Sequence, residues 1–154
     1  MDPSGLDIEI VGGEPFKNMM NGLIDKLHKK SKTAAGIIDR LRKSPQKVVI
    51  APGSNNQGSV TYPRQGTNPP FIFFPGNGKF GNGGTETGSP GHSKVVPVVP
   101  ERGLAHELGH VVIPPPPGER KSPDLPYENE VIRKIENPIA KELGLPKRTS
   151  YDHF

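Results

Sequence analysis

Apolar residues in the first third of the chain recur first with the period of a strand and then with that of a helix. Residues 6–11 alternate apolar and polar side chains and end at two glycines, which predicts a short half-buried strand. Over residues 15–30 the apolar positions lie three and four apart, which predicts one helix with a continuous apolar stripe. A second helix is expected from Thr33, its N-cap, to the Ser44-Pro45 pair that ends it.

Three short apolar runs then predict strands. Residues 47–51 suit the middle of a sheet, and residues 59–62 and 71–74 predict two further strands beside prolines. Glycine is so frequent over residues 75–91 that we expect a mobile loop with no packed element, either a flap over a cleft or a plain excursion. The prolines of residues 95–100 remove amide donors, so this stretch suits only a sheet edge, where a substrate chain could lie alongside.

Helical periodicity returns in the last third. Residues 104–112 are expected to be helical, and four consecutive prolines, residues 114–117, end that helix. Residues 127–143 predict a further helix, in which Pro138 indicates a kink or a break into two helices and Gly144 provides the cap, before an irregular tail. This order of elements predicts an α+β fold with a small mixed sheet packed on helices.

The composition limits the size of the core and the kinds of site. A length of 154 residues predicts a single domain, residues 1–154, and the 19 glycines and 19 prolines indicate a small core under long loops. Cysteine is absent, which excludes disulfides, cysteine-ligated zinc and a cysteine nucleophile, so a metal site must use histidine and carboxylate. The sequence contains no apolar run long enough to cross a membrane and no signal-peptide pattern. Although the net charge is +4, lysine and arginine are scattered rather than clustered with aromatic residues, and we interpret them as solvated surface, which argues against a nucleic-acid partner.

Residues 106–110, with the sequence HELGH, are the one place where residue types and spacing dictate a chemistry. Side chains four apart lie on one face of a helix, so the imidazoles of His106 and His110 can reach a single metal ion. Glu107 lies beside that face and can hold a metal-bound water without being a ligand, as in the H-E-x-x-H zinc metallopeptidases. The uncharged flanks allow this helix to be buried under a cleft.

A catalytic zinc ion takes three protein ligands and keeps one position for water, so the histidine pair needs a third side chain. The places where a metzincin would have Gly and His are occupied by Ile113 and Pro116, which excludes that subtype. A carboxylate from the later helix remains, as in His2Glu sites. Spacing alone does not choose among the candidates, which are Glu128, Glu130, Glu136 and, more remotely, Glu142, with His92 and His153 as outsiders.

A second motif follows the first one. It consists of NE at residues 129–130, IEN at 135–137, ELGLP at 142–146 and RTSY at 148–151. With HELGH, this set resembles the signature of a family of bacterial effector zinc metallopeptidases, whose best-known members are type III secretion effectors that cut host MAP kinases. Similar domains are found at the ends of polymorphic secreted toxins. The resemblance covers residues 106–151 and implies a compact zincin-like fold that binds Zn²⁺ through His106, His110 and Glu130, with Glu136 as the alternative third ligand.

The resemblance further implies a zinc-dependent endopeptidase that acts as a secreted effector or toxin, with a protein of the target cell as its substrate. A specialised secretion system would deliver it, and an immunity protein could neutralise it in the producer. Zinc would lower the pKa of bound water from 15.7 toward about 7, and Glu107 would take the proton and hand it to the leaving amine. Tyr151 or Arg148 would donate to the developing oxyanion, or would only pin the C-terminal tail.

Two other functions fit the sequence. The metal could be structural, in a binding module without catalysis, although the intact Glu107 argues against this. A toxin that targets nucleic acid, such as a nuclease, is favoured only by the basic net charge and by the likeness to toxins.

Overall fold

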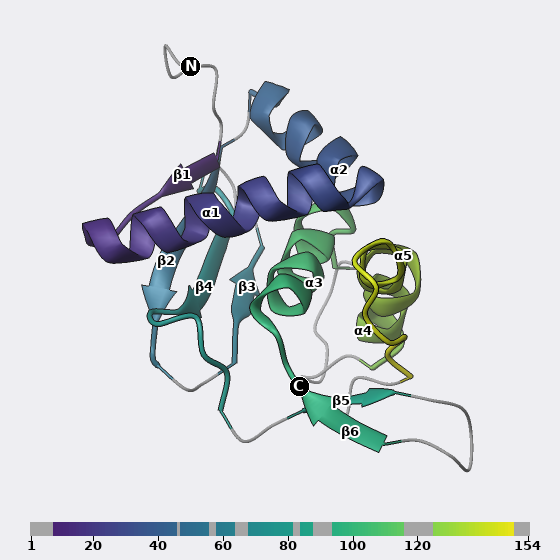
Figure 1. Cartoon of the computed structure of the whole chain (residues 1–154). Helices are drawn as coiled ribbons and strands as arrows, with labels where there is room; N and C mark the ends of the chain where they lie inside the picture. Colours follow the sequence, from purple (N-terminus) through teal and green to yellow (C-terminus); the bar gives the residue numbers. More distant parts are fainter. Residues whose placement is uncertain are drawn as a thin grey trace.

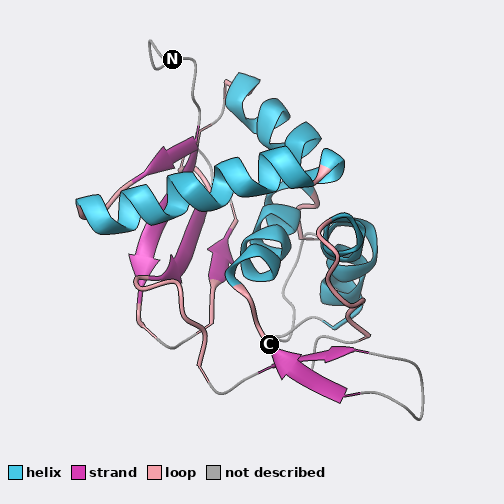
Figure 2. Cartoon of the chain, viewed as in Figure 1, coloured by secondary structure: helices cyan, strands magenta, loops and turns pink. Residues whose placement is uncertain are grey.

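A four-stranded sheet, a set of helices and a separate hairpin make up the described part of the chain (Figures 1 and 2). The computed structural model describes residues 8–45, 47–55, 58–63, 68–81, 84–87, 94–115 and 125–149. The elements in chain order are β1 (Ile8–Ile10), α1 (Glu14–Lys30), α2 (Lys32–Lys43), β2 (Val48–Gly53), β3 (Val60–Tyr62), β4 (Phe71–Pro75), β5 (Gly84–Thr87), β6 (Lys94–Pro97), α3 (Pro100–Val112), α4 (Leu125–Val131), the π-helical turn η1 (Ile132–Glu136) and α5 (Asn137–Glu142). The predicted α+β architecture with a small mixed sheet is therefore confirmed.

The sheet has the strand order β1-β2-β4-β3. Strands β1, β2 and β4 are parallel, and β3 runs antiparallel to β4 at the edge. In β2, Ile50 pairs with Ile10 on one side and Ile72 on the other, which confirms the prediction of a central strand. Alternate side chains of β2 and β4 enter the core on the helix side of the sheet: Val48, Ile50, Ile72 and Phe74.

Helix α1 crosses the sheet in Figure 1 and supplies the predicted apolar stripe. Its buried residues are Phe16, Met20, Leu23, Ile24 and Leu27. Helix α2 begins two residues earlier than expected, because the hydroxyl of Ser31, not Thr33, accepts the capping hydrogen bond from the Ala34 N–H. Ser31 and Thr33 both donate to the carboxylate of Glu142 in α5, which joins α2 to the end of the C-terminal helix.

Helix α3 lies between the sheet and the C-terminal helices, and every residue from Arg102 to Gly109 is buried. One side of α3 contributes Leu104, Ala105 and Leu108 to the core shared with α1, α2 and the sheet. The other side packs on α4 and the π-helical turn. A Cβ atom at Gly109 would lie 2.6 Å from Val131 Cγ1, so glycine is what permits this close approach.

The C-terminal helix breaks ahead of Pro138, as the sequence predicts, and the break takes the form of the π-helical turn η1. Two residues eight apart in an unbroken α-helix point about 80° away from each other. A π turn holds about one residue more than an α turn, so it rotates Glu136 back toward the side of Glu128. Gly144, at φ +76°, ends α5 as expected.

Strands β5 and β6 form a separate antiparallel hairpin in which Thr85 pairs with Val96. The expectation of no packed element over residues 75–91 is therefore wrong for Gly84–Thr87, because threonine-rich backbone there pairs with the valines of β6. Among the described strands β6 pairs only with β5, in agreement with its predicted edge position. None of the helices in the described ranges is long and apolar enough to span a bilayer.

Replacing Gly109 with alanine should force α4 and η1 away from α3. The added methyl group would meet Val131 at 2.6 Å and Ile135 at 3.2 Å, so we expect a loss of about 1–3 kcal/mol in the free energy of unfolding, measured by urea denaturation. Gly22→Ala is the matched control, because an added Cβ there meets nothing within 4 Å and should stabilise the helix by roughly 0.5–1 kcal/mol. Equal effects of the two substitutions would contradict close packing at Gly109.

Candidate metal centre

Three side-chain atoms from α3 and α4 converge on one point. His106 Nε2 and His110 Nε2 lie 3.1 Å apart, and Glu128 Oε2 lies 2.8 Å from the first and 3.0 Å from the second. Three corners of a tetrahedron around an ion with bonds of about 2.05 Å lie about 3.3 Å apart. The triangle therefore fits a metal ion after adjustments of a few tenths of an ångström. Within the described ranges, these side chains form the one group of three that could hold a metal ion.

Glu136 sets the orientation of His106. Its Oε1 accepts a hydrogen bond of 2.7 Å from His106 Nδ1, and since an ionised carboxylate can only accept, the ring proton lies on Nδ1. When the ring is neutral, the lone pair of Nε2 is thereby directed at the convergence point. The resemblance made Glu136 the alternative third ligand; the structure places its carboxylate at Nδ1, on the far side of the imidazole.

Two buried guanidinium groups surround the Glu136 carboxylate. Arg102 Nη1 donates to Oε2 and Arg148 Nη1 donates to Oε1, each at 3.0 Å. Burial by itself would raise the pKa of Glu136, but the hydrogen bond from His106 and the charges of His106, Arg148 and Arg102 lower it below 4.5. Glu136 is thus held ionised, the state that its bond to His106 Nδ1 requires.

Tyr127 has the corresponding role for His110. The Tyr127 hydroxyl donates to the Ile113 carbonyl beyond the end of α3, so it accepts from His110 Nδ1 at 3.0 Å. In the tautomer with the proton on Nδ1, the lone pair of His110 Nε2 faces the same point as that of His106. Adjacent residues of α4, Tyr127 and Glu128, therefore orient one imidazole and complete the triangle.

The electrostatics of the metal-free site favour a proton on His106. Burial would lower the pKa of His106, but hydrogen bonds to Glu128 and Glu136 and the charges of Glu107 and Glu136 outweigh it and raise the pKa from 6.5 to about 9. Burial would raise the pKa of Glu128, but the hydrogen bonds and charges of His106 and His110 lower it from 4.5 to about 2. The same attraction for positive charge serves a metal cation.

Glu107 faces the edge strand β3. Ser59 Oγ donates to its Oε2 and Thr61 Oγ1 to its Oε1, both at 2.7 Å, and only 2% of Glu107 is exposed. Ser59, which directly precedes β3, and Thr61 are two positions apart along extended backbone and so point to one side of the strand. The other side presents Val60 and Tyr62, which are 43% and 57% exposed. This strand thus places hydroxyls inward and apolar groups outward, because its inner neighbour is a carboxylate.

Glu130, the expected third ligand, does not reach the imidazoles. Its carboxylate accepts a hydrogen bond of 2.8 Å from Lys134 Nζ one turn later, and its side chain is 39% exposed. Two residues along a helix correspond to about 200° of rotation, so Glu128 and Glu130 lie on nearly opposite faces. Glu128 precedes the buried Val131 and Ile132 by three and four residues, which puts it on the inner face.

The remaining candidates lie elsewhere. Glu142 binds Ser31 and Thr33 in α2, away from the histidines. Arg148, expected to donate to an oxyanion or to pin the tail, is buried against Glu136, and its backbone N–H and C=O bond to the side chain of Asn137. Its backbone also bridges to Thr87 of β5. Tyr151, His92 and His153 lie outside the described residues.

Several residues of the site had no role in the sequence interpretation. Tyr127, Arg102, Ser59 and Thr61 act through other side chains, and no spacing rule connects them with HELGH. Glu128 was recognised only as one of several acids. The sequence nevertheless contains an indication in favour of Glu128. Glu130 and Lys134 have the i, i+4 spacing of a solvent-facing ion pair, which places Glu130 on the outer face of the helix.

Comparisons of the chain with protein-family models, with curated proteins and with solved structures find no match.

The unfolding free energy of the metal-free protein should depend on the His106 proton. Because folding raises the pKa of His106 above 6.5, protonated His106 stabilises the fold fully below pH 6.5, and this contribution is lost as the pH rises through about 9. Urea denaturation in the presence of a chelator, at pH 6 and pH 9.5, should give the lower free energy at the higher pH. The variant His106→Gln should flatten that difference, and an unchanged difference would contradict this account of the site.

Proposed function

We propose that the protein is a zinc-dependent endopeptidase. The observation that supports this most directly is the triangle of His106 Nε2, His110 Nε2 and Glu128 Oε2 with the carboxylate of Glu107 on the next residue of the same helix. Two imidazoles and one carboxylate are the donor set of His2Glu catalytic zinc sites, in which a fourth position stays open for water. We accordingly propose Glu128, rather than Glu130, as the third ligand.

The residues of the chain divide the work of hydrolysis. A zinc ion held by the triangle would polarise the scissile carbonyl and acidify water. Glu107 takes a proton from the water and delivers it to the leaving amine. Ser59 and Thr61 hold the two oxygens of Glu107, each of which keeps a second lone pair for the water proton. Glu136 and Tyr127 keep both Nε2 lone pairs directed at the metal position.

The biological setting is also part of the proposal. Action as a secreted effector or toxin, on a protein of a target cell, is supported by the resemblance of HELGH and the later motif to effector peptidases. The structure adds that several parts of that later motif have physical roles: Glu136 and Arg148 pair beside His106, and Asn137 binds the Arg148 backbone.

A second candidate function is a binding module with a structural metal. It is favoured by one observation, which is that Glu107 is 2% exposed and both of its oxygens already accept hydroxyl hydrogen bonds. A base that serves water must be reached by water, so β3 would have to leave room for it. Measuring turnover and metal content on the same samples separates the two functions.

Replacing Glu107 with glutamine should remove peptide cleavage and leave zinc binding intact. The amide keeps the shape of the side chain but cannot take a proton, so cleavage of casein should slow by about 10²–10⁴-fold. Zinc content after dialysis should equal that of the wild type, because Glu107 is not a ligand. A fully active Glu107→Gln protein would contradict the mechanism. No cleavage by the zinc-loaded wild type, with metal bound, would favour the binding module.

The third ligand can be identified with a matched pair of variants. Glu128→Gln should weaken zinc binding by at least about tenfold to a hundredfold, measured by competition with a chromophoric chelator. Glu130→Gln changes a carboxylate two residues away on the exposed face, which binds Lys134, and should leave the affinity unchanged. The reverse result would restore Glu130 as the ligand.

A further inference from the structure

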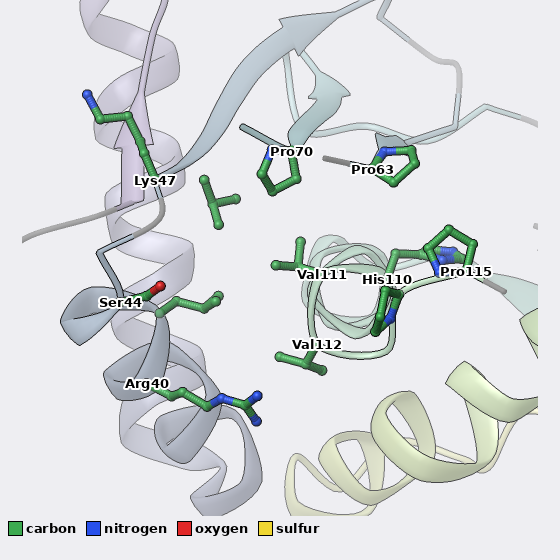
Figure 3. A pocket seen from close by; sticks show the side chains of 12 residues that line it. Arg40, Ser44, Lys47, Pro63, Pro70, His110, Val111, Val112 and Pro115 are labelled. Carbon is green, nitrogen blue, oxygen red and sulfur yellow. The ribbon is translucent and has the colours of Figure 1, made fainter. Parts of the chain in front are cut away.

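We propose that the cavity beyond the end of α3 is a specificity pocket for a glutamate side chain of the substrate, next to the scissile bond. This inference rests on the peptidase function proposed above. The cavity has a volume of about 270 Å³ and lies between the C-terminal ends of α2 and α3 and the ends of β3 and β4 (Figure 3). Ligand sites usually begin at about 300 Å³, so the cavity suits one side chain better than a whole small molecule.

The cavity begins at the metal site. His110 contributes its Nε2 to the ligand triangle and is also one of the residues that line the cavity. In Figure 3 His110 and Pro115 lie on one side of the cavity, and the end of α2, with Arg40 and Ser44, lies on the other. A peptide whose carbonyl lies at the metal position would therefore have a neighbouring side chain within reach of the cavity across His110.

Most of the wall is apolar. It is formed by aliphatic side chains and proline rings: Leu41, Val48, Pro63, Pro70, Val111, Val112, Pro114 and Pro115. Such a wall favours the methylene stem of a side chain over a polar group close to the backbone. A longer acidic residue thus fits better than aspartate.

The charged residues of the wall are cations. Arg40 and Lys47 line the cavity, and no acidic residue does. Lys47 Nζ is already paired with Glu9 at 3.0 Å, and its side chain points away from the cavity in Figure 3. Arg40 extends along the wall toward Val112, and none of the ion pairs within the described ranges involves it. A carboxylate at the end of an apolar stem is the group that this wall complements.

Arg40 also stabilises the C-terminal end of α2, and the experiment must distinguish this role from binding of a substrate carboxylate. It lies in the last turn of α2, where any cation interacts favourably with the helix dipole. Lys43 occupies the same turn, is exposed and does not line the cavity. Lys43→Glu therefore reproduces the change in net charge and in the helix end without changing the cavity.

The test is a map of cleavage sites made with zinc-loaded protein and a peptide library in which one position carries Glu, Gln, Leu or Lys. The wild type should cleave bonds next to Glu about three- to tenfold faster than those next to Gln, as judged by kcat/KM. Arg40→Glu should reverse the preference between Glu and Lys. Arg40→Gln should abolish the preference for Glu without reversing it, which keeps the test available if the charge reversal impairs folding. Lys43→Glu should behave as the wild type.

The outcomes are distinguishable. Cleavage without a preference for Glu, or with a preference that Arg40→Glu and Arg40→Gln leave unchanged, would overturn the pocket and leave the peptidase function standing. An equal shift with Lys43→Glu would assign the effect to overall charge and would also overturn it. No cleavage of any library member by wild-type protein with stoichiometric zinc would overturn the peptidase function and this inference together.

Discussion

The carboxylate of Glu136 is buried among one imidazole and two guanidinium groups, and the rest of the site depends on it. It connects three parts of the chain: Arg102 and His106 in α3, the π-helical turn that bears Glu136 itself, and Arg148 in the tail. Each cation would be costly to bury alone, and removal of one partner from a buried ion pair typically costs about 3–5 kcal/mol. The histidine orientation, the attachment of the tail and the packing of η1 on α3 thus have one common support.

The charges around His106 also explain why a proton and a metal ion compete there. With neutral imidazoles, the carboxylates of Glu107, Glu128 and Glu136 face only two guanidinium groups, which leaves one negative charge in a buried region. Either a proton on His106 or a divalent cation in the triangle compensates it, and both use the lone pair of Nε2. The site is therefore built to attract positive charge before any ligand distance is considered.

The periodicity of apolar residues predicted those helices and strands that pack one face against the hydrophobic core. The stripe of α1 and the apolar run of β2 each face a single core. The placement of His106 and His110 on one face of a helix follows from their spacing of four residues alone. Parts that depend on two elements at once could not be predicted in this way. The π turn that aligns Glu128 with Glu136, and the hydroxyls of β3 that meet Glu107, arise from tertiary contacts. That Glu128 and not Glu130 faces the histidines is an intermediate case. The helical spacing of Glu128 from the apolar residues Val131 and Ile132 indicates it, whereas the resemblance to the effector peptidases favoured Glu130.

The position of Arg148 along the chain has a consequence for the order in which the site matures. Its guanidinium neutralises Glu136, but it is synthesised about 40 residues after His106. At about 5–20 residues per second, the ribosome adds it roughly two to eight seconds later. Until then Glu136 has only Arg102, and not Arg148, as a guanidinium partner. The nascent chain therefore completes the ion-pair network around Glu136 only after His106, His110 and Glu128 have all been made.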